Sequence, residues 1–372
     1  MKQPHIESLL ILALTGSALA DPSTYDKIWN TAKLINNSEA KVIQSLNLSG
    51  RLQGDAYSFR SEETSHENIE WRRFRFGFKA QVFNHFTLHS EMDLDMNEVD
   101  SGSWNEFYNR LTDTYIAWTP PSKDWKIKIG KQSAGFTLDG ATSSKKLLVP
   151  ERSVVAENIW FPTEYFTGAS ASGKAGNGSF KVGGFSASGE SEFGHFESGY
   201  FTLLSAGWEF NENGTLRLDY VFNNPDHQSD YAVGTWDLKH IASLVYQQML
   251  SEKLGLWADL SGAKGINQSN LVGVDFMPFY NFTDRLQLVL QYANVISLEG
   301  EPDVRLARYA YKNSSATKAE SVHNLLLGFN VYLYGHKLKW QNAIEYNRGT
   351  NLAGTGNDYN GYGITSALRI SW

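Results

Sequence analysis

The chain has 372 residues, of which 41% are hydrophobic and 13% aromatic, and its formal net charge at pH 7 is −7. It contains no cysteine, which excludes disulfide bonds, thiolate metal sites and cysteine nucleophiles. The acidic balance argues against a general nucleic-acid-binding protein. A chain of this length can form two or three soluble domains or one large barrel.

The first twenty residues have the three parts of a secretory signal peptide. Lys2 supplies positive charge, residues 9–14 form an apolar run, and Ala18-Leu19-Ala20 gives a small-x-small cleavage pattern. A buried amino-terminal helix is the alternative, because Glu7 is charged and the apolar run is short. After Ala20, no run reaches the roughly 18 apolar residues that a membrane-spanning helix needs. We therefore expect residues 1–20 to be the signal peptide of a periplasmic, secreted or outer-membrane protein.

From Lys41 onward, apolar and polar residues alternate with a period of two, which is typical of strands with one apolar face. Residues 21–40, which precede this pattern, are polar and compatible with a helix, so we expect an N-terminal extension outside the main fold. The alternation predicts about sixteen strands, in residues 41–53, 70–83, 86–95, 112–118, 125–132, 165–173, 180–185, 200–210, 216–222, 239–249, 254–260, 271–278, 285–292, 324–333, 338–346 and 362–372.

Short and long connectors alternate between these strands. The short ones lie near Asn84 and in residues 120–124, 174–178, 211–214, 251–253, 281–284 and 335–337. The long ones are residues 57–68, 96–109, 133–164, 188–199, 223–237, 263–269, 296–320 and 347–360. Outer-membrane barrels have this asymmetry, with tight periplasmic turns and longer outer loops. A soluble sandwich has no reason to segregate its loop lengths so regularly.

Aromatic residues flank the short connectors, as Trp118 and Trp125 do on either side of one turn. Girdles of amphipathic rings occupy these positions in membrane barrels, and ordinary core aromatics are the alternative. The last alternating segment ends on Trp372, and we expect it to pair with the first strand and remove both sheet edges. Residues 41–372 are therefore predicted to form an all-β, transmembrane antiparallel β-barrel of about sixteen strands in the outer membrane.

The segment 133–164 follows a strand in which Ile127 and Ile129 alternate with Lys126 and Lys128. Loops this long are usually functional or disordered. In a barrel, such a loop can fold into the lumen and narrow it. We expect residues 133–164 to be an inward-folded constriction loop.

Several short segments match the pattern of a known family. They are Gly50-Arg-Leu-Gln53, Trp71-Arg-Arg-Phe74, Gly77-Phe-Lys79, Asp113-Thr-Tyr-Ile116, Lys128-Ile-Gly-Lys131, Phe136-Thr-Leu-Asp139, Ala141-Thr-Ser-Ser-Lys145 and Glu151-Arg-Ser153. Together they resemble the phosphate-selective porins of the O/P family, over roughly residues 48–153. The last three segments resemble the constriction loop of that family. Beyond Ser153 the match is the barrel pattern alone.

The resemblance implies a homotrimer of sixteen-stranded barrels in which arginine, lysine and loop hydroxyls meet phosphate. Carried over by position, the phosphate-contacting candidates are Arg72, Arg73, Ser143 and Ser144. Two features depart from the phosphate-specific members: Gly140 stands where they have a lysine, and residues 223–237, which correspond to their arginine-rich loop, contain no arginine or lysine. These departures argue against tight phosphate selectivity.

Strand parity gives a second set of candidates for an ion pathway. It places Arg73, Arg75, Lys79, Lys126 and Lys128 in the lumen, near the basic loop residues Lys145 and Arg152. Guanidinium and ammonium groups suit phosphate or carboxylate oxygens, and rings of basic side chains make anion pores. Wall salt bridges are the alternative, because parity also places other charges inside, among them Arg51, Lys181, Arg217, Lys339, Arg369, Asp55, Glu91, Asp93, Asp113, Asp259 and Asp275.

Arg72 conflicts with this parity. Regular alternation points it outward, where a charge at mid-membrane costs roughly 2–4 kcal/mol. Either its side chain reaches the headgroups, or a bulge turns it inward.

Other chemistries have less support. The acidic residues in 91–100 are compatible with calcium or with a solvated strand end. No zinc spacing, nucleophile elbow or phosphate-cradling loop is present, so we expect no metal, no cofactor and no enzyme. A membrane-barrel hydrolase built from scattered Ser, His and acidic residues has nothing positive to support it.

The sequence therefore predicts an outer-membrane porin for passive diffusion of small, preferably anionic solutes such as phosphate. A general or cation-preferring porin and a structural or adhesive barrel with binding loops are the alternatives. The expected partners are small anions, outer-membrane lipid, the barrel-assembly machinery that reads the terminal strand, and two further copies of the chain in a homotrimer. No nucleic-acid partner is expected.

Overall fold

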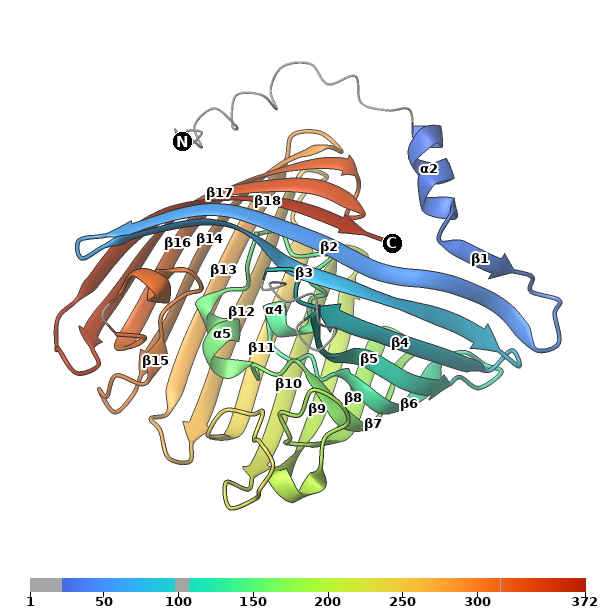
Figure 1. The fold of residues 1–372 in the computed structure, drawn as a ribbon, viewed down its shortest axis with the longest axis horizontal. Coiled ribbons are helices and arrows are strands. Elements are labelled where there is room, and N and C mark those ends of the chain that lie inside the picture. Colours follow the sequence, from blue (N-terminus) through green and yellow to red (C-terminus); the bar gives the residue numbers. More distant parts are fainter. Residues whose placement is uncertain (1–21, 98–106, 315) are drawn as a thin grey trace.

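The computed structural model describes residues 22–97, 107–314 and 316–372, so the expected signal peptide in residues 1–20 lies outside the described residues. The described chain forms one antiparallel sheet that closes on itself (Figure 1). Of the eighteen strands in this sheet, β1 and β15 are short additions, and the other sixteen make the barrel wall. The prediction of an all-β, antiparallel barrel of about sixteen strands is confirmed.

The wall strands follow one another in chain order around the barrel. They are β2 (Ile43–Ser61), β3 (Ser65–Val82), β4 (Phe86–Leu94), β5 (Tyr108–Trp118), β6 (Trp125–Ser133), β7 (Tyr165–Ala175), β8 (Gly178–Ser186), β9 (Gly199–Asn211), β10 (Gly214–Pro225), β11 (Leu238–Met249), β12 (Leu254–Gly265), β13 (Leu271–Asn281), β14 (Leu286–Ser297), β16 (Lys318–Tyr334), β17 (Leu338–Leu352) and β18 (Tyr359–Ser371).

The barrel closes between its first and last wall strands. β18 pairs with β2 from Gly361 opposite Ser61 to Ser371 opposite Arg51. Just beyond this ladder, the backbones of Gly50 and Trp372 exchange two hydrogen bonds of 3.2 Å. Closure satisfies the backbone groups that would otherwise form two open edges.

The two faces of the wall differ as the alternation predicts. Phe78, Ile116 and Ile129 are exposed on the outside of the barrel, whereas the inward residues Gln53 and Asp275 are buried by side chains and loops in the interior. An apolar outer face with a polar interior is the arrangement of membrane barrels. None of the described helices is long and apolar enough to cross a membrane.

The prediction of a long outer connector at residues 57–68 is wrong, because β2 and β3 extend through most of this segment. Tyr57 and Phe59 continue the inward-facing positions, and Tyr57 stacks on Tyr309 at 3.9 Å between ring centroids. Tyr309 comes from the connector after β14, so tertiary packing keeps this polar-looking stretch in a strand.

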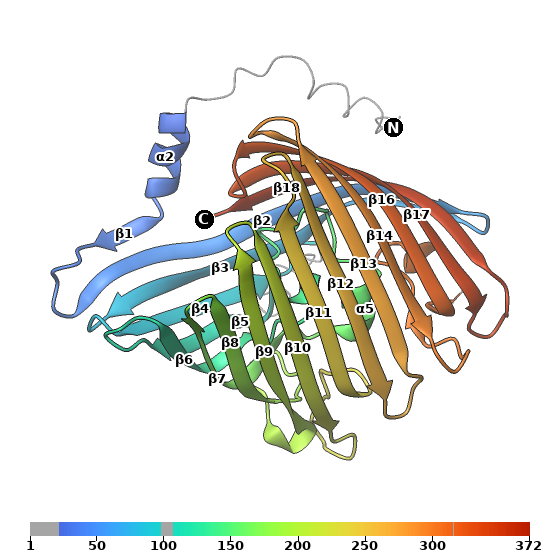
Figure 2. The same cartoon turned by 180° about the vertical axis from the view of Figure 1, so that it is seen from behind.

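Two connectors enter the barrel. The first joins β6 to β7 and contains α4 (Leu138–Ala141) and α5 (Val154–Ile159). The second joins β14 to β16 and contains β15 (Val304–Arg305) and the 3₁₀ helix η2 (Ala310–Asn313). Both views show α5 enclosed between β2–β3 and the opposite wall of β12 and β13 (Figures 1 and 2). We call the first connector the inner loop.

Three elements lie outside the wall or at its ends. In the expected N-terminal extension, α2 (Pro22–Asn30) precedes β1 (Lys33–Asn36), which pairs with the start of β2. Trp29 of α2 donates through Nε1 to the carbonyl of Ser371 at 2.6 Å. The helix is therefore attached beside the point of barrel closure. A further 3₁₀ helix, η1 (Phe196–Ser198), precedes β9.

Candidate functional site

The first half of the inner loop is bound to acidic side chains of the wall. The backbone N–H of Thr137 donates to Asp219 of β10 at 3.1 Å, and that of Leu138 donates to Asp259 of β12 at 2.7 Å. Arg217 of β10 donates to the carbonyl of Thr137 at 2.7 Å. Buried backbone donors require such partners, so the wall carboxylates fix this end of the loop.

The second half of the loop is bound to basic and amide side chains on the other side of the lumen. Arg369 of β18 donates to the carbonyl of Pro150 at 2.9 Å, and Gln53 of β2 donates to that of Ser144 at 3.2 Å. Lys339 of β17 donates to the carbonyl of Leu147. Several basic side chains that parity places in the lumen therefore hold loop backbone.

Arg72 enters the lumen through a β-bulge. Gln53 pairs with Arg73 and Gly54 pairs with Trp71, so Arg72 is the extra residue of β3. Its guanidinium makes a bidentate ion pair with Glu151 of the inner loop. Of the two alternatives for Arg72, the structure therefore contains the bulge that turns the side chain inward, and not a side chain that reaches the headgroups.

The other arginine candidates also contact carboxylates. Arg73 lies 3.8 Å from Glu151 and donates to Gln53 at 3.0 Å. Arg75 contacts Asp93 at 3.2 Å and Glu164 at 3.3 Å, and Arg152 contacts Glu164 at 3.2 Å. Buried charges need this pairing, since an unpaired one is costly. The structure thus places these arginines in a network that joins the inner loop to the wall.

The serine and lysine candidates of the inner loop differ in exposure and in their hydrogen-bond partners. Ser144 is buried, and its Oγ accepts from Arg51 of β2 at 2.7 Å. Ser143 is exposed. Lys145 is half-buried, and its Nζ donates to the carbonyl of Trp372 at 3.2 Å. Burial, together with the positive charge of Arg51, lowers the pKa of Lys145 to about 8.

The remaining candidates, Lys79, Lys126 and Lys128, make no ion pair within the described part of the chain. Lys79 and Lys126 are exposed, and Lys128 lies 4.2 Å above the ring of Tyr115. Lys181 of β8 has no ion pair among the described residues either, and its Nζ donates to the carbonyl of Ser133 at 3.3 Å. We call these four lysines the lysine wall.

The register of the sheet aligns the lysine wall with serines. Lys126 of β6 lies opposite Ser172 of β7, Ser172 lies opposite Lys181, and Lys181 lies opposite Ser205 of β9. Side chains in directly opposite positions are about 5 Å apart at Cβ. Ammonium and hydroxyl groups therefore alternate in one inward row across four strands.

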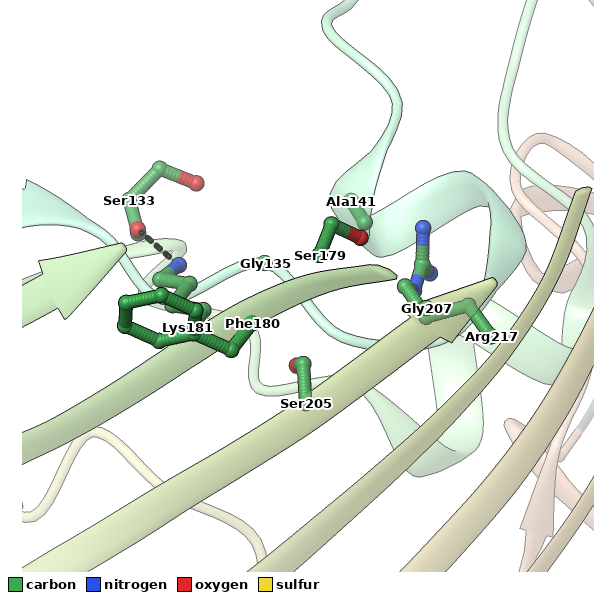
Figure 3. A pocket seen from close by; sticks show the side chains of 9 residues that line it. All are labelled: Ser133, Gly135, Ala141, Ser179, Phe180, Lys181, Ser205, Gly207 and Arg217. Atoms are coloured by element: carbon green, nitrogen blue, oxygen red, sulfur yellow. Dashed lines mark hydrogen bonds between the residues drawn. The ribbon is translucent and has the colours of Figure 1, made fainter. Parts of the chain in front are cut away.

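A cavity of about 300 Å³ lies between this row and the inner loop (Figure 3). Lys181 and Arg217 lie on either side of Ser179 and Ser205 in this view, and the loop contributes Gly135 and Ala141. Arg217 forms an ion pair with Asp219 at 2.9 Å, so Lys181 is the lining cation without a carboxylate partner among the described residues.

The acidic groups of the inner loop and of the wall on its far side are largely covered. Asp139, Asp259 and Asp275 are at most 2% exposed, and each accepts hydrogen bonds, from Ser153, Ser243 and Gln291 respectively. Asp113 of β5 is the half-buried acidic neighbour of the lysine wall. The inward lysines of β3, β6 and β8 therefore lack ion pairs among the described residues, while Asp139, Asp259 and Asp275 are occupied by hydrogen bonds.

Strand parity placed Lys181 inside the barrel, among the charges for which wall salt bridges were the alternative. Ser179 and Ser205 were not predicted from the sequence, because an uncharged residue at an inward position gives no signal of its own. The register between β8, β9 and β10 brings these residues to one cavity together with Arg217. Within the described residues, no group of acidic and histidine side chains is arranged to hold a metal, and residues 98–106, which include the end of the acidic stretch, lie outside them.

The model of the family "Phosphate-selective porin O and P" matches residues 46–202. Residues 46–202 carry the signature of this porin family. The resemblance predicted from the sequence is confirmed over that part of the chain. Porin O of Pseudomonas aeruginosa is 27% identical over 159 residues, which is 41% of this chain and 35% of porin O. The chain thus matches about a third of the length of this curated relative.

Solved porin structures share the fold. An anion-selective porin from Comamonas acidovorans superposes with a TM-score of 0.60 at 10% identity, covering 88% of this chain and 99% of that one. The trimer form of OmpT, an outer-membrane protein of Vibrio cholerae, gives 0.56 at 12% identity, with coverage of 88% and 99%. Identities this low show the fold alone. The porin family match and the barrel together indicate the outer membrane.

Proposed function

We propose that the protein is a porin through which small solutes, preferably anions, diffuse passively across the outer membrane. The observation that carries this proposal is the lysine wall. Lys79, Lys126, Lys128 and Lys181 face the lumen without ion pairs among the described residues, whereas the acidic groups that face the inner loop are covered. Ammonium groups without an ion-pair partner raise the local concentration of anions.

The inner loop is proposed to narrow the passage. It is fixed to β10 and β12 at one end and to β2, β17 and β18 at the other. The open space then lies beside the loop, along β6–β10, where the cavity is found. Phosphate is one candidate solute. Gly140 and the absence of arginine and lysine from residues 223–237 argue for weak rather than tight phosphate binding.

We also propose how the chain is exported, inserted and assembled. We expect residues 1–20 to direct export, the barrel-assembly machinery to insert the chain, and outer-membrane lipid to surround its apolar face. A homotrimer is the proposed assembly, since the family resemblance implies one and OmpT has a trimer form.

Planar-bilayer recording of the purified protein tests the proposal. We expect discrete, ohmic conductance steps, and larger steps when residues 143–149 of the inner loop are replaced by a short glycine-serine linker. Protein that is folded and inserted but gives no steps would contradict the porin function. Unchanged steps in the shortened variant would show that the loop does not narrow the passage.

A further inference from the structure

The cavity beside the lysine wall has a chemistry that the family resemblance does not assign. The carried-over residues Arg72, Arg73 and Ser144 bind the inner loop or the wall. The cavity lies on other strands and is lined by Ser133 of β6, Ser179 and Lys181 of β8, Ser205 of β9 and Arg217 of β10. These residues offer accessible polar groups to a solute in the lumen.

The serine hydroxyls of this cavity are available to a solute. The hydroxyls of Ser133, Ser179 and Ser205 make no hydrogen bond within the described residues, and none of the three residues is buried. By contrast, the hydroxyl of the neighbouring Ser170 is occupied, since it donates to Gln132 at 2.7 Å. A hydroxyl both donates and accepts, so the three can bind hydroxyl groups as well as anionic oxygens.

The charge of the cavity suits a single anionic group. Lys181 supplies an ammonium that is bound only to a carbonyl, and the charge of Arg217 is offset by Asp219. Lys126 and Lys128 lie on the adjacent part of the same wall, and the negative charge of Asp113 partly offsets the charges of Lys128 and Lys181. A polyphosphate would need more uncompensated cations than line this cavity.

The volume distinguishes an organic solute from a bare inorganic ion. About 300 Å³ is the space of roughly ten water molecules in the liquid. It is also the lower end of the range for small-molecule sites, about 300–1,000 Å³. Inorganic phosphate would leave most of it to water, whereas a small organic acid with several hydroxyls would reach both Lys181 and the serines.

We infer that this cavity is a binding subsite for small hydroxylated organic anions, in which Lys181 binds the carboxylate or phosphate and Ser133, Ser179 and Ser205 bind the hydroxyls. This inference rests on the proposed porin function and specifies its solute. Binding is weak enough for release, because each hydroxyl contributes only a modest net hydrogen bond. The subsite therefore slows a permeating solute without trapping it.

The test is block of chloride current in planar bilayers by added potassium salts. We expect gluconate and glucose 6-phosphate to reduce the current saturably, at lower concentrations than propanoate and inorganic phosphate. Gluconate carries a carboxylate and glucose 6-phosphate carries a phosphate, so the pair shows which anionic group binds. Propanoate and inorganic phosphate carry the same anionic groups without the sugar hydroxyls. Equal block by gluconate and propanoate, or stronger block by inorganic phosphate than by glucose 6-phosphate, would overturn the inference.

Variants assign the effect to the cavity. The double variant Ser179→Ala with Ser205→Ala should weaken gluconate block by about tenfold while propanoate block is retained, as expected for losing one or two hydrogen bonds. Lys181→Gln should weaken block by every anion. Ser170→Ala is the matched control, since its hydroxyl is already occupied, and should leave gluconate block unchanged. Gluconate block that survives both cavity variants would overturn the assignment, whereas a complete absence of conductance in the wild type would instead contradict the porin function.

Discussion

Arg72 of β3 and Glu151 of the inner loop form a bidentate ion pair, with 3.0 Å between Arg72 Nη2 and Glu151 Oε2. Arg73 and Arg308 also lie within 4.0 Å of this carboxylate. Burial alone would raise the pKa of Glu151, but the three arginines hold it well below its ordinary value. Since Arg308 belongs to the second inward connector, one carboxylate joins the wall and both connectors.

Replacing Glu151 with Gln should loosen the inner loop. The substitution leaves Arg72 and Arg73 without their shared carboxylate, and breaking a buried pair in this way costs about 3–5 kcal/mol. We expect noisier single-channel current and faster proteolytic cleavage within the inner loop. Glu209→Gln is the control, because its ion pair with Lys174 is exposed and such pairs contribute little. Equal noise and cleavage in the two variants would contradict the anchoring role of Glu151.

Replacing Trp29 with Ala should weaken the closed barrel at its seam. The change removes the hydrogen bond to Ser371 and the packing of Trp29 on Tyr334, whose ring centroids are 5.0 Å apart. The expected loss is about 1–3 kcal/mol. On gels, the compact folded form should convert to the unfolded form at a lower temperature. Ile28→Ala, at an exposed position, should convert at the wild-type temperature; a lowered temperature there as well would argue against a specific contact.

The anion preference should fall as the pH rises through about 8, where Lys145 loses its proton. Burial lowers the pKa of this lysine to about 8, so it is charged at pH 7 and mostly neutral at pH 9. Lys145→Arg should show a weaker pH dependence, because arginine stays protonated. Reversal potentials at both pH values measure the effect. The charged groups that act on Lys145 are Arg51, Arg75, Glu91 and Asp113. An unchanged pH dependence in the arginine variant would show that Lys145 does not set it.

The architecture could be predicted because its signal is local. A period of two along each strand identifies the faces of Phe78 and Lys79 without knowledge of their neighbours. The direction of Arg72 could not be predicted in this way, since the bulge depends on which residues of β2 pair with β3. Alternation describes a strand alone, whereas a bulge is a property of two strands.

The candidate site was harder to predict for a related reason. A charge at an inward position gives no information about its partner. Lys339 and Lys126 both face inward, yet Lys339 holds the carbonyl of Leu147 and Lys126 has no ion pair among the described residues. The path of the inner loop decides between these roles, and it depends on contacts with strands far along the chain. The cavity at Lys181 likewise arises from the register of three strands.

Reversing the charge of Lys126 and Lys128 tests the lysine wall. At physiological ionic strength the Debye length is about 8 Å, so only charges close to the passage bias a permeating ion. We expect Lys126→Glu with Lys128→Glu to move the reversal potential toward cations. Lys264→Glu, at an exposed position near the outer end of β12, is the control and should have little effect. A shift of the same size in the control would mean that the overall charge, rather than the wall, sets selectivity.

The reversal potential of the wild-type channel in a potassium chloride gradient shows whether the lumen or the whole molecule sets ion selectivity. The net charge of −7 favours cations if the whole molecule sets selectivity, whereas the lysine wall favours anions if the lumen does. We expect a potential that favours chloride over potassium, with the largest preference at low salt, where screening is weakest. A preference for potassium at low salt would contradict selectivity set by the lysine wall.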